Sequence, residues 1–327
     1  MIYFLLLSSL SSAQPSADRV RVMTFNAENL FDTVHDEGKD DYAYLPAAQK
    51  RSPEHKARCA KLRKAYLKDE CLDLDWSDKA LELKLSRVAE AVKQADPDIV
   101  VLQEIENSRV LESLRKKLAA GYGPGILVEG KDRRGIDQAM LSRLPLEKPA
   151  VLHNPELSGG RGILEARFRL PDGALLTVFA LHLPAPYQPR KERIRVLQRL
   201  NALCPASLSV AAGDFNITEA EDASYRVSER HINGTWAQSQ DLGCKSCRGT
   251  SYYRGDDSWS FLDRILLSKD LASGGGWSVD PGSIRVAYEA RSEREEDGTP
   301  ARFDAHFGTG VSDHFPVVLD LVRRSKP

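Results

Sequence analysis

The sequence lacks any large excess of charge of one sign. Its 327 residues contain 46 Lys and Arg against 47 Asp and Glu, which gives a formal net charge of −1. A chain with this balance has no global electric field that would hold it on a nucleic acid or an anionic membrane. A polyanionic substrate must therefore be bound by local basic patches, and we expect no stable membrane association.

Long apolar runs are absent after the N-terminus, where no stretch reaches the roughly 18 residues of a membrane-spanning helix. Residues 1–13 are apolar and end in Ser11, Ser12 and Ala13. They are too short to cross a bilayer and fit a secretory signal, so we expect cleavage after Ala13 and a secreted or periplasmic protein. They contain no basic residue before the apolar core. A strand or a mis-assigned start is therefore the alternative.

Cysteine is scarce, with five residues in the whole chain. In an oxidising compartment, the two pairs that are close in sequence predict disulfides between Cys59 and Cys71 and between Cys244 and Cys247. Cys204 precedes a proline and an apolar run, which predicts a buried free thiol. A zinc site at the Cys-x-x-Cys pair is the alternative, but no second pair or His cluster has matching spacing.

Repeats and low-complexity linkers are also absent, so we expect one domain over residues 18–324. Short runs of Val, Ile and Leu alternate with amphipathic stretches, which is typical of the α/β and α+β classes. The expected strands are 20–25, 99–103, 136–141, 163–168, 175–183, 208–212, 258–267 and 316–321. The expected helices are 81–92, 110–118 and 194–200.

Residues 35–80 interrupt this pattern with a polar insertion, acidic at 35–41 and basic from residue 50 onward. A loop of this length without secondary structure is uncommon, so a 59–71 disulfide is a plausible restraint. The acidic part lacks the alternating ligands and glycine of an EF-hand, which favours a solvated loop over a calcium site. A second polar segment, 289–304, is interpreted as a surface loop.

Polar residues stand directly after or beside several expected strands, where layered α/β folds form their binding crevices. Taken singly, they have ordinary explanations as helix caps, turn residues or core histidines. Together they supply hard oxygen ligands for a divalent cation, amides for a phosphate and His–carboxylate pairs for proton transfer. These residues are Asn26, Glu104, His182, Asp214, Asn216, Asp263, Asp313 and His314.

The motifs around these residues resemble those of the endonuclease/exonuclease/phosphatase superfamily, in particular its deoxyribonuclease I-like, secreted bacterial members. The motifs follow the family's order and are Thr24-Phe25-Asn26, Leu102-Gln103-Glu104, Ala180-Leu181-His182-Leu183, Gly213-Asp214-Phe215-Asn216, Ser260-Phe261-Leu262-Asp263-Arg264 and Ser312-Asp313-His314-Phe315-Pro316. The resemblance implies a four-layer α/β sandwich, in which two packed mixed β-sheets are flanked by helices. It also implies metal-dependent hydrolysis of phosphoesters.

The resemblance implies a role for each residue. Glu104 is expected to be the main ligand of Mg²⁺, or of Mn²⁺ or Ca²⁺ in its place, with Asn26 and Asp313 near the metal or its waters. His314 is expected to take a proton from the attacking water while Asp263 holds its other ring nitrogen.

The remaining catalytic residues are expected to handle the phosphate. Asp214 and Asn216 would orient the water and the scissile phosphate. His182 would donate a hydrogen bond to a phosphate oxygen, with Asp137 as its carboxylate partner; a solvent-facing strand residue is the alternative for Asp137.

Basic and amide side chains near these motifs are candidates for contacts with phosphates outside the reacting one. We expect substrate contacts from Asn107, Arg133, Arg134 and Arg161. The run of charges at 190–195 is better explained as a solvated helix face.

These expectations favour a secreted, monomeric endonuclease of low sequence preference that acts on DNA more readily than RNA. Because one set of catalytic residues can serve several substrates, a phosphatase or phosphodiesterase for lipid head groups or small phosphoesters is the alternative. An inactive binding protein is the third and least favoured class, since the acid, amide and imidazole residues are all present.

Overall fold

A computed structural model describes residues 16–118, 121–204, 208–274 and 276–324 of the chain. The predicted signal segment, residues 1–13, lies outside these ranges. Among the described residues, no helix combines the length and the apolar character needed to cross a membrane.

The first sheet is mixed, with the strand order β13-β14-β1-β2-β4-β3. Strand β1 pairs in parallel with β2 and antiparallel with β14. This arrangement places the end of β1, the end of β2 and the beginning of β14 at one edge of the sheet. The strands are β1 (Arg19–Leu30), β2 (Ile99–Ile105), β3 (Ile126–Leu127), β4 (Asp137–Ser142), β13 (Trp277–Val286) and β14 (Val317–Arg323).

The second sheet is also mixed, with the order β5-β6-β7-β8-β12-β9. Strand β7 is parallel to β8, and β12 is antiparallel to β8, so the ends of β7 and β8 meet the start of β12. A Cβ at Gly213 would overlap the carbonyl of Leu181, so only glycine allows this close approach of β7 and β8. The strands are β5 (Val151–His153), β6 (Ile163–Arg169), β7 (Leu175–His182), β8 (Ser209–Asp214), β9 (Trp236–Gln238) and β12 (Asp263–Ser268).

The core lies between the two sheets, because successive residues of a strand point to opposite faces. Val22 and Val101 of the first sheet pack in one buried cluster with Val178 and Ile265 of the second. Their sequence neighbours, such as Met23, point outward. The apolar character of both faces explains why the strands read as continuous apolar runs.

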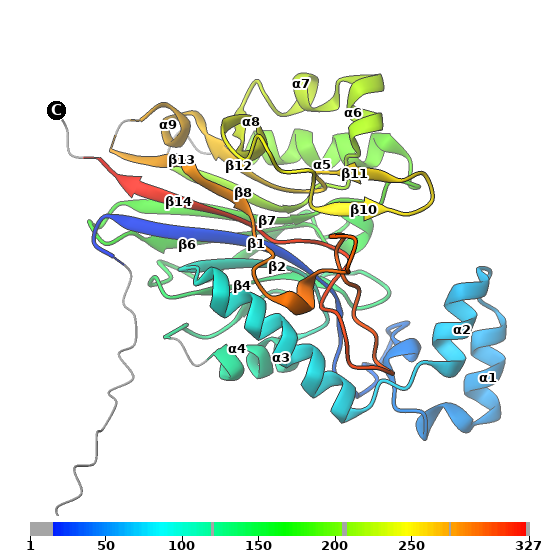
Figure 1. Cartoon of the computed structure of the whole chain (residues 1–327). Coiled ribbons are helices and arrows are strands. Elements are labelled where there is room, and N and C mark those ends of the chain that lie inside the picture. Colours follow the sequence, from blue (N-terminus) through cyan, green and yellow to red (C-terminus); the bar gives the residue numbers. More distant parts are fainter. Residues whose placement is uncertain (1–15, 119–120, 205–207, 275, 325–327) are drawn as a thin grey trace, which may run out of the picture.

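Helices cover both outer faces and complete the four layers (Figure 1). The outward face of the first sheet packs against α3 and α4, and that of the second sheet against α5. Shorter helices follow β8 and β12. The helices outside the insertion are α3 (Asp78–Ala95), α4 (Ser108–Leu118), α5 (Arg190–Leu203), α6 (Glu219–Tyr225), α7 (Val227–His231), α8 (Ser239–Leu242) and α9 (Lys269–Ser273), with single 3₁₀ turns η3 (Ser158–Gly160) and η4 (Arg291–Glu293).

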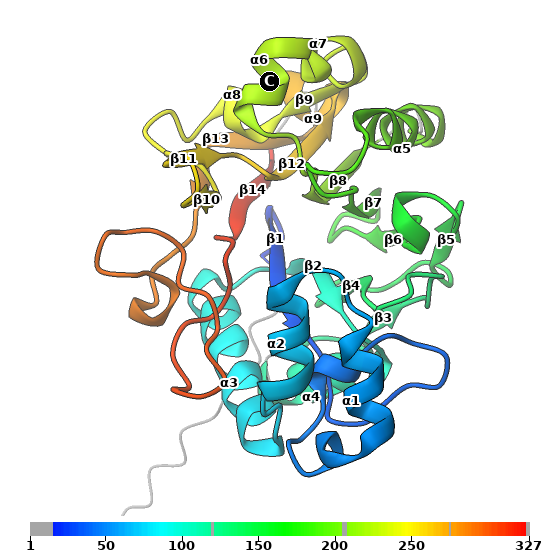
Figure 2. The ribbon, with the colours of Figure 1, turned by 90° about the vertical axis from the view of Figure 1, so that its right-hand side faces the viewer.

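The polar insertion is a small helical unit at one end of the sheets (Figures 1 and 2). It contains the turns η1 (Tyr42–Tyr44) and η2 (Gln49–Arg51) and the helices α1 (Pro53–Ala60) and α2 (Ala65–Asp73). Trp76 anchors it, since its indole N–H donates to the carbonyl of Phe31 at 3.1 Å and its ring packs edge-on against Tyr44. Aromatic packing and hydrogen bonds therefore order a segment whose sequence shows little apolar periodicity.

The expectation of one strand over 258–267 was wrong. The chain forms β11 (Ser258–Ser260), which pairs with β10 (Ser251–Tyr253) in a separate hairpin, and then enters the second sheet as β12. Between them, the carbonyl of Leu262 accepts a hydrogen bond from the N–H of Phe215 at 2.7 Å. This break sets Asp263 at the first position of β12.

Candidate active site

The strand ends of both sheets meet in a cleft of about 780 Å³. Parallel pairing brings together the C-terminal ends of β1 and β2 and those of β7 and β8, while β12 and the segment before β14 begin at the same edge. The two packed sheets therefore bring residues far apart in sequence to one place. Those predicted from the motifs that line the cleft are Asn26, Glu104, His182, Asp214, Asn216, Asp313 and His314.

Irregular backbone turns the first sheet's acidic residues toward the cleft. The pairing of β1 with β2 shifts register between Asn26 and Leu30, and that of β2 with β4 shifts between Leu102 and Ile105. Glu104 has a φ of 63°, in the left-handed region. Such conformations cost about 1–3 kcal/mol in non-glycine residues and are concentrated at functional sites. Strand irregularities of this kind re-aim side chains next to active sites.

His314 and Asp263 form a buried pair. Nδ1 of His314 lies 2.7 Å from Oδ2 of Asp263. Burial lowers the pKa of His314, but the carboxylates of Asp263, Asp313 and Asp214 together outweigh burial and hold that pKa well above its usual value. Because Asp263 occupies Nδ1, Nε2 is the ring nitrogen left to exchange a proton with a bound molecule.

Asp214 is the centre of an amide network beside this pair. Its Oδ2 accepts hydrogen bonds from Nδ2 of Asn26 at 3.2 Å and from Nδ2 of Asn216 at 3.0 Å. Its Oδ1 accepts from the backbone N–H of Asn216 at 2.8 Å. Burial raises the pKa of Asp214 to about 7, against the opposing charge of His314. The network fixes a carboxyl group and two amides at the floor of the cleft.

His182 faces two carboxylates of the cleft. Its Nε2 lies 3.5 Å from Oδ2 of Asp214 and 3.9 Å from Oε1 of Glu104. Burial lowers its pKa well below the usual value, and the positive charges of Arg161 and Arg134 lower it further. The imidazole is therefore neutral, with one N–H to donate.

The expected pairing of His182 with Asp137 was wrong. Oδ1 of Asp137 accepts the backbone N–H of Gly130 at 3.0 Å, and Nδ1 of His182 has no hydrogen-bond partner among the described residues. Asp137 is buried, so the alternative of a solvent-facing strand residue fails as well. Burial raises the pKa of Asp137 to about 6. Its hydrogen bond ties β4 to the 130–136 loop rather than to the imidazole.

The carboxylates of the cleft fit a divalent metal ion. Oε2 of Glu104 accepts the backbone N–H of Asn29 at 2.9 Å, while its Oε1 has no hydrogen-bond donor within the described ranges. Asp313 lines the same cleft and its carboxylate is partly exposed. Hard oxygen donors of this kind are the preferred ligands of Mg²⁺ and Ca²⁺. Glu104 and Asp313 are thus the residues that would hold the ion, with Asn26 beside them.

Two buried ionisable side chains, those of Glu28 and Lys84, lie next to the segment that carries Asp313 and were not predicted from the sequence. Oε2 of Glu28 accepts the N–H of Asp313 at 3.1 Å, and Oε1 accepts from Nε of Arg302 at 2.5 Å. The ammonium of Lys84, fully buried on α3, donates to the carbonyl of Val311 at 2.5 Å. These contacts hold the segment that presents Asp313 and His314. Glu28 lies two residues after Asn26, and that spacing was the available signal.

Of the predicted substrate-binding residues, Arg134 and Arg161 line the cleft and the other two do not. Arg134 is an exposed residue whose guanidinium makes no hydrogen bond to another described residue, whereas Arg161 is buried and its Nη1 lies 3.4 Å from Oδ2 of Asp132. Arg133 points to solvent in an ion pair with Asp40 at 2.9 Å. The cleft therefore offers Arg134 as a cation available to a substrate.

The prediction for Asn107 finds no support in its position. Its Oδ1 accepts the N–H of Val110 at 3.0 Å at the start of α4, and its Nδ2 donates to Asp32 and Asp36. Asn107 is a helix cap, which is the ordinary role of asparagine before a helix. The expectation of a solvated helix face at 190–195 was also wrong for Arg193. This side chain is buried, and its Nη2 lies 2.6 Å from Oε1 of Glu221.

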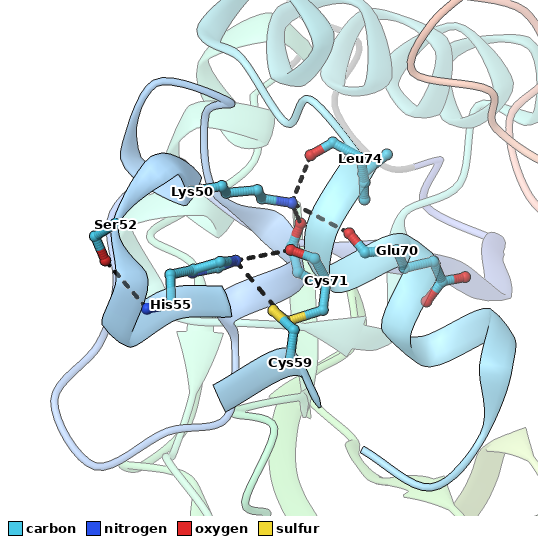
Figure 3. The surroundings of a disulfide bond; sticks show 8 residues. Lys50, Ser52, His55, Cys59, Glu70, Cys71 and Leu74 are labelled. Carbon is cyan, nitrogen blue, oxygen red and sulfur yellow. Dashed lines mark hydrogen bonds between the residues drawn. A yellow bond between two sulfur atoms is a disulfide. The ribbon is translucent and has the colours of Figure 1, made fainter. Parts of the chain in front are cut away.

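Both predicted disulfides are present. Cys59 is bonded to Cys71, and Cys244 to Cys247. Cys204 is half-buried against the apolar layer under α5, rather than fully buried as expected. The first disulfide joins α1 to α2 within the insertion (Figure 3).

The chain belongs to the Endonuclease/Exonuclease/phosphatase family, whose model matches residues 76–314. Members of this family are metal-dependent phosphoester hydrolases, and this protein is an enzyme of that class. The two mixed sheets and their flanking helices agree with the family's α/β sandwich, which confirms the predicted fold.

Comparison with individual proteins gives more distant similarities. An inositol phosphosphingolipids phospholipase C of Schizosaccharomyces pombe is 25% identical over 169 residues, and the match spans 45% of this chain and 39% of that protein. The structure of D. rerio TDP2 complexed with a single strand DNA product has a TM-score of 0.58 and 16% identity, and covers 93% of this chain and 98% of its own. The structure of a family member from Bacteroides thetaiotaomicron has a TM-score of 0.57 and 17% identity, and the match covers 96% of this chain and 100% of that one. At these identities the structural likeness shows the fold alone.

Proposed function

We propose that the protein is a secreted or periplasmic nuclease that hydrolyses phosphodiester bonds of nucleic acid with a divalent metal ion, Mg²⁺ in the first place. The observation that carries this proposal is Arg134, whose guanidinium lies unpaired by any described residue in the same cleft as the His314–Asp263 pair. A cation placed beside the reacting centre suits a substrate with more than one phosphate.

The residues of the cleft divide the chemistry between them. Glu104 and Asp313, with Asn26, would hold the ion, which when bound neutralises charge that develops on the phosphoryl oxygens. Once its imidazolium has lost its proton, His314 takes one from the attacking water at Nε2, and Asp263 stabilises the imidazolium that forms again. Asp214 and Asn216 orient the water and the scissile phosphate. Neutral His182 donates a hydrogen bond to a phosphate oxygen.

The second candidate is a phosphodiesterase for lipid head groups. The match to the phospholipase C of Schizosaccharomyces pombe favours it, because that protein's name refers to a phosphosphingolipid substrate. The cleft itself favours the first candidate. It contains Arg134, which pairs with no described residue and suits a second phosphate of a nucleic-acid strand.

One panel of substrates separates the two candidates. The purified chain is incubated with plasmid DNA, single-stranded DNA, single-stranded RNA, sphingomyelin vesicles and inositol phosphates, each with Mg²⁺ and with EDTA. We expect EDTA-sensitive cleavage of nucleic acid. Turnover of a lipid or inositol phosphate without cleavage of any nucleic acid would overturn the proposal and favour the second candidate.

A further inference from the structure

The insertion forms one wall of the catalytic cleft. Lys64, Tyr66 and Leu67, at the beginning of α2, line the same cleft as Glu104 and His314. Tyr187, which follows β7, lines it as well. These residues come from two segments that are more than 100 positions apart, and none belongs to a motif of the family resemblance.

A cation and two aromatic rings meet at this wall. Nζ of Lys64 lies 4.4 Å from the ring centroid of Tyr187 and 5.6 Å from that of Tyr66. Tyr187 is 74% exposed and Tyr66 is 54% exposed. Within the described residues, Lys64 makes no ion pair with a carboxylate. The Lys64 ammonium has no carboxylate partner among these residues, and more than half of each tyrosine is exposed, so both are available to a ligand.

Several contacts hold the C-terminal half of α2 and join it to α1 (Figure 3). Nζ of Lys50 donates to the carbonyls of Glu70 and Leu74, near the end of α2, at 3.2 Å and 2.5 Å. Nε2 of His55 lies 2.8 Å from the carbonyl of Cys71, and Cys71 is bonded to Cys59. These contacts hold the C-terminal half of α2, and its first turn lines the cleft.

We propose that Lys64, Tyr66 and Tyr187 form a subsite for an unpaired nucleotide next to the scissile phosphate, a role that rests on the proposed nuclease function. Bases stack on aromatic side chains, and a lysine beside the rings pairs with the backbone phosphate. In a duplex, the faces of a base are covered by its neighbours except at an end. The subsite therefore selects single-stranded nucleic acid over the interior of a duplex.

The test compares KM values on three substrates. The full chain is assayed with a single-stranded oligonucleotide, with the same oligonucleotide in a duplex, and with bis(p-nitrophenyl) phosphate, a diester without a base. We expect Tyr187→Ala and Tyr66→Ala each to raise KM for the single strand by about 5- to 100-fold, the range of a lost base–aromatic stack. The effect on duplex and on the small diester is expected to be smaller. Tyr187→Phe, which keeps the ring, should have the same KM for the single strand as the wild type.

A matched control is Tyr253→Ala. Tyr253 is 68% exposed on β10 and does not line the cleft, so its removal should leave all three KM values unchanged. If Tyr187→Ala and Tyr66→Ala leave KM for the single strand unchanged, or raise it equally for the small diester, the subsite is refuted while the nuclease assignment stands. If the wild-type chain cleaves no nucleic acid, the proposed function fails first and the subsite fails with it.

Discussion

His314 and Asp263, 51 residues apart in sequence, are joined by a contact of 2.7 Å between Nδ1 and Oδ2. The contact depends on both sheets, since Asp263 opens β12 of the second sheet and His314 lies three residues before β14 of the first. The way the two sheets pack against each other sets the distance between these two side chains. Proton transfer is therefore coupled to the packing of the apolar layer between the sheets.

Replacing His314 by alanine should lower the hydrolysis rate by about 10²- to 10⁴-fold, the usual contribution of a general base. Asp263→Asn should also lower the rate, because the amide no longer stabilises the imidazolium. His153→Ala is a matched control, since Nε2 of His153 lies 2.8 Å from Oε2 of Glu165, outside the cleft. Steady-state assays with circular dichroism of each variant check the result. Near-normal turnover of folded His314→Ala would contradict the assigned base.

Glu104→Gln should weaken metal binding. The amide keeps the size of the side chain but removes the charge that attracts a divalent cation. We expect the Mg²⁺ concentration at half-maximal activity to rise by tenfold or more, and the maximal rate to fall by orders of magnitude. Calorimetric titration of the purified variant with Mg²⁺ or Mn²⁺ measures binding independently of turnover. Glu147→Gln, on a surface pair with Arg169, should leave both quantities unchanged. Wild-type metal affinity in Glu104→Gln would rule out its role as main ligand.

Arg134 and Arg133 are neighbours in sequence, but we expect only Arg134 to contact a phosphate of the substrate. Arg134 lines the cleft, whereas Arg133 pairs with Asp40 at the surface. In a His314→Ala background, Arg134→Ala should reduce the salt dependence of nucleic-acid binding by about one phosphate contact, a slope change of about 0.7 for a single strand and 0.9 for a duplex. Arg133→Ala should change the slope little. Fluorescence anisotropy over a series of salt concentrations measures both, and equal effects of the two substitutions would refute the distinction.

The Cys59–Cys71 disulfide should stabilise the insertion. For a loop closed over 12 residues, the chain-entropy model gives about 3 kcal/mol of unfolding free energy. We expect Cys59→Ser with Cys71→Ser to lose much of this in urea unfolding and to become more sensitive to proteolysis within residues 35–80. The double variant Cys244→Ser with Cys247→Ser should lose less unfolding free energy, because these cysteines are only 3 positions apart in sequence. Equal stability of the wild type and the 59/71 variant would show that hydrogen bonds and packing hold the insertion alone.

The sequence predicted what depends on local pattern and on motifs. The apolar runs located the main strands, and the polar residues after them located the cleft, because strand ends of two packed sheets converge. The sequence could not predict which hydrogen-bond partner each side chain finds. Asp137 binds a backbone N–H instead of His182, and Asn107 caps a helix instead of facing a substrate. Contacts such as that of Lys64 with Tyr187 depend on the tertiary placement of an insertion with no apolar periodicity.

Glu293 is another residue whose tertiary contacts could not be predicted from the sequence, since it lies in the segment 289–304 that was interpreted as a surface loop. The side chain is buried, and its Oε2 accepts the N–H of Ala290 at 2.8 Å. Burial, and less strongly the nearby carboxylates of Glu289 and Glu90, raise its pKa to about 8. The folded protein therefore keeps a proton that the unfolded chain releases near pH 4.3, the ordinary value for glutamate.

The sign of the pH effect follows from this difference. Between about pH 4.3 and 8 the folded state binds more protons at Glu293 than the unfolded state, so this residue's contribution to stability is greatest below that window and falls as pH rises through it. Glu293→Gln, a neutral isostere, removes the titration. Urea unfolding at pH 5 and pH 8.5 should show the wild type losing stability relative to the variant as pH rises, whereas the exposed neighbour Glu296→Gln should follow the wild type. A constant difference between wild type and Glu293→Gln at both pH values would show that the carboxyl group titrates alike in the folded and unfolded chain.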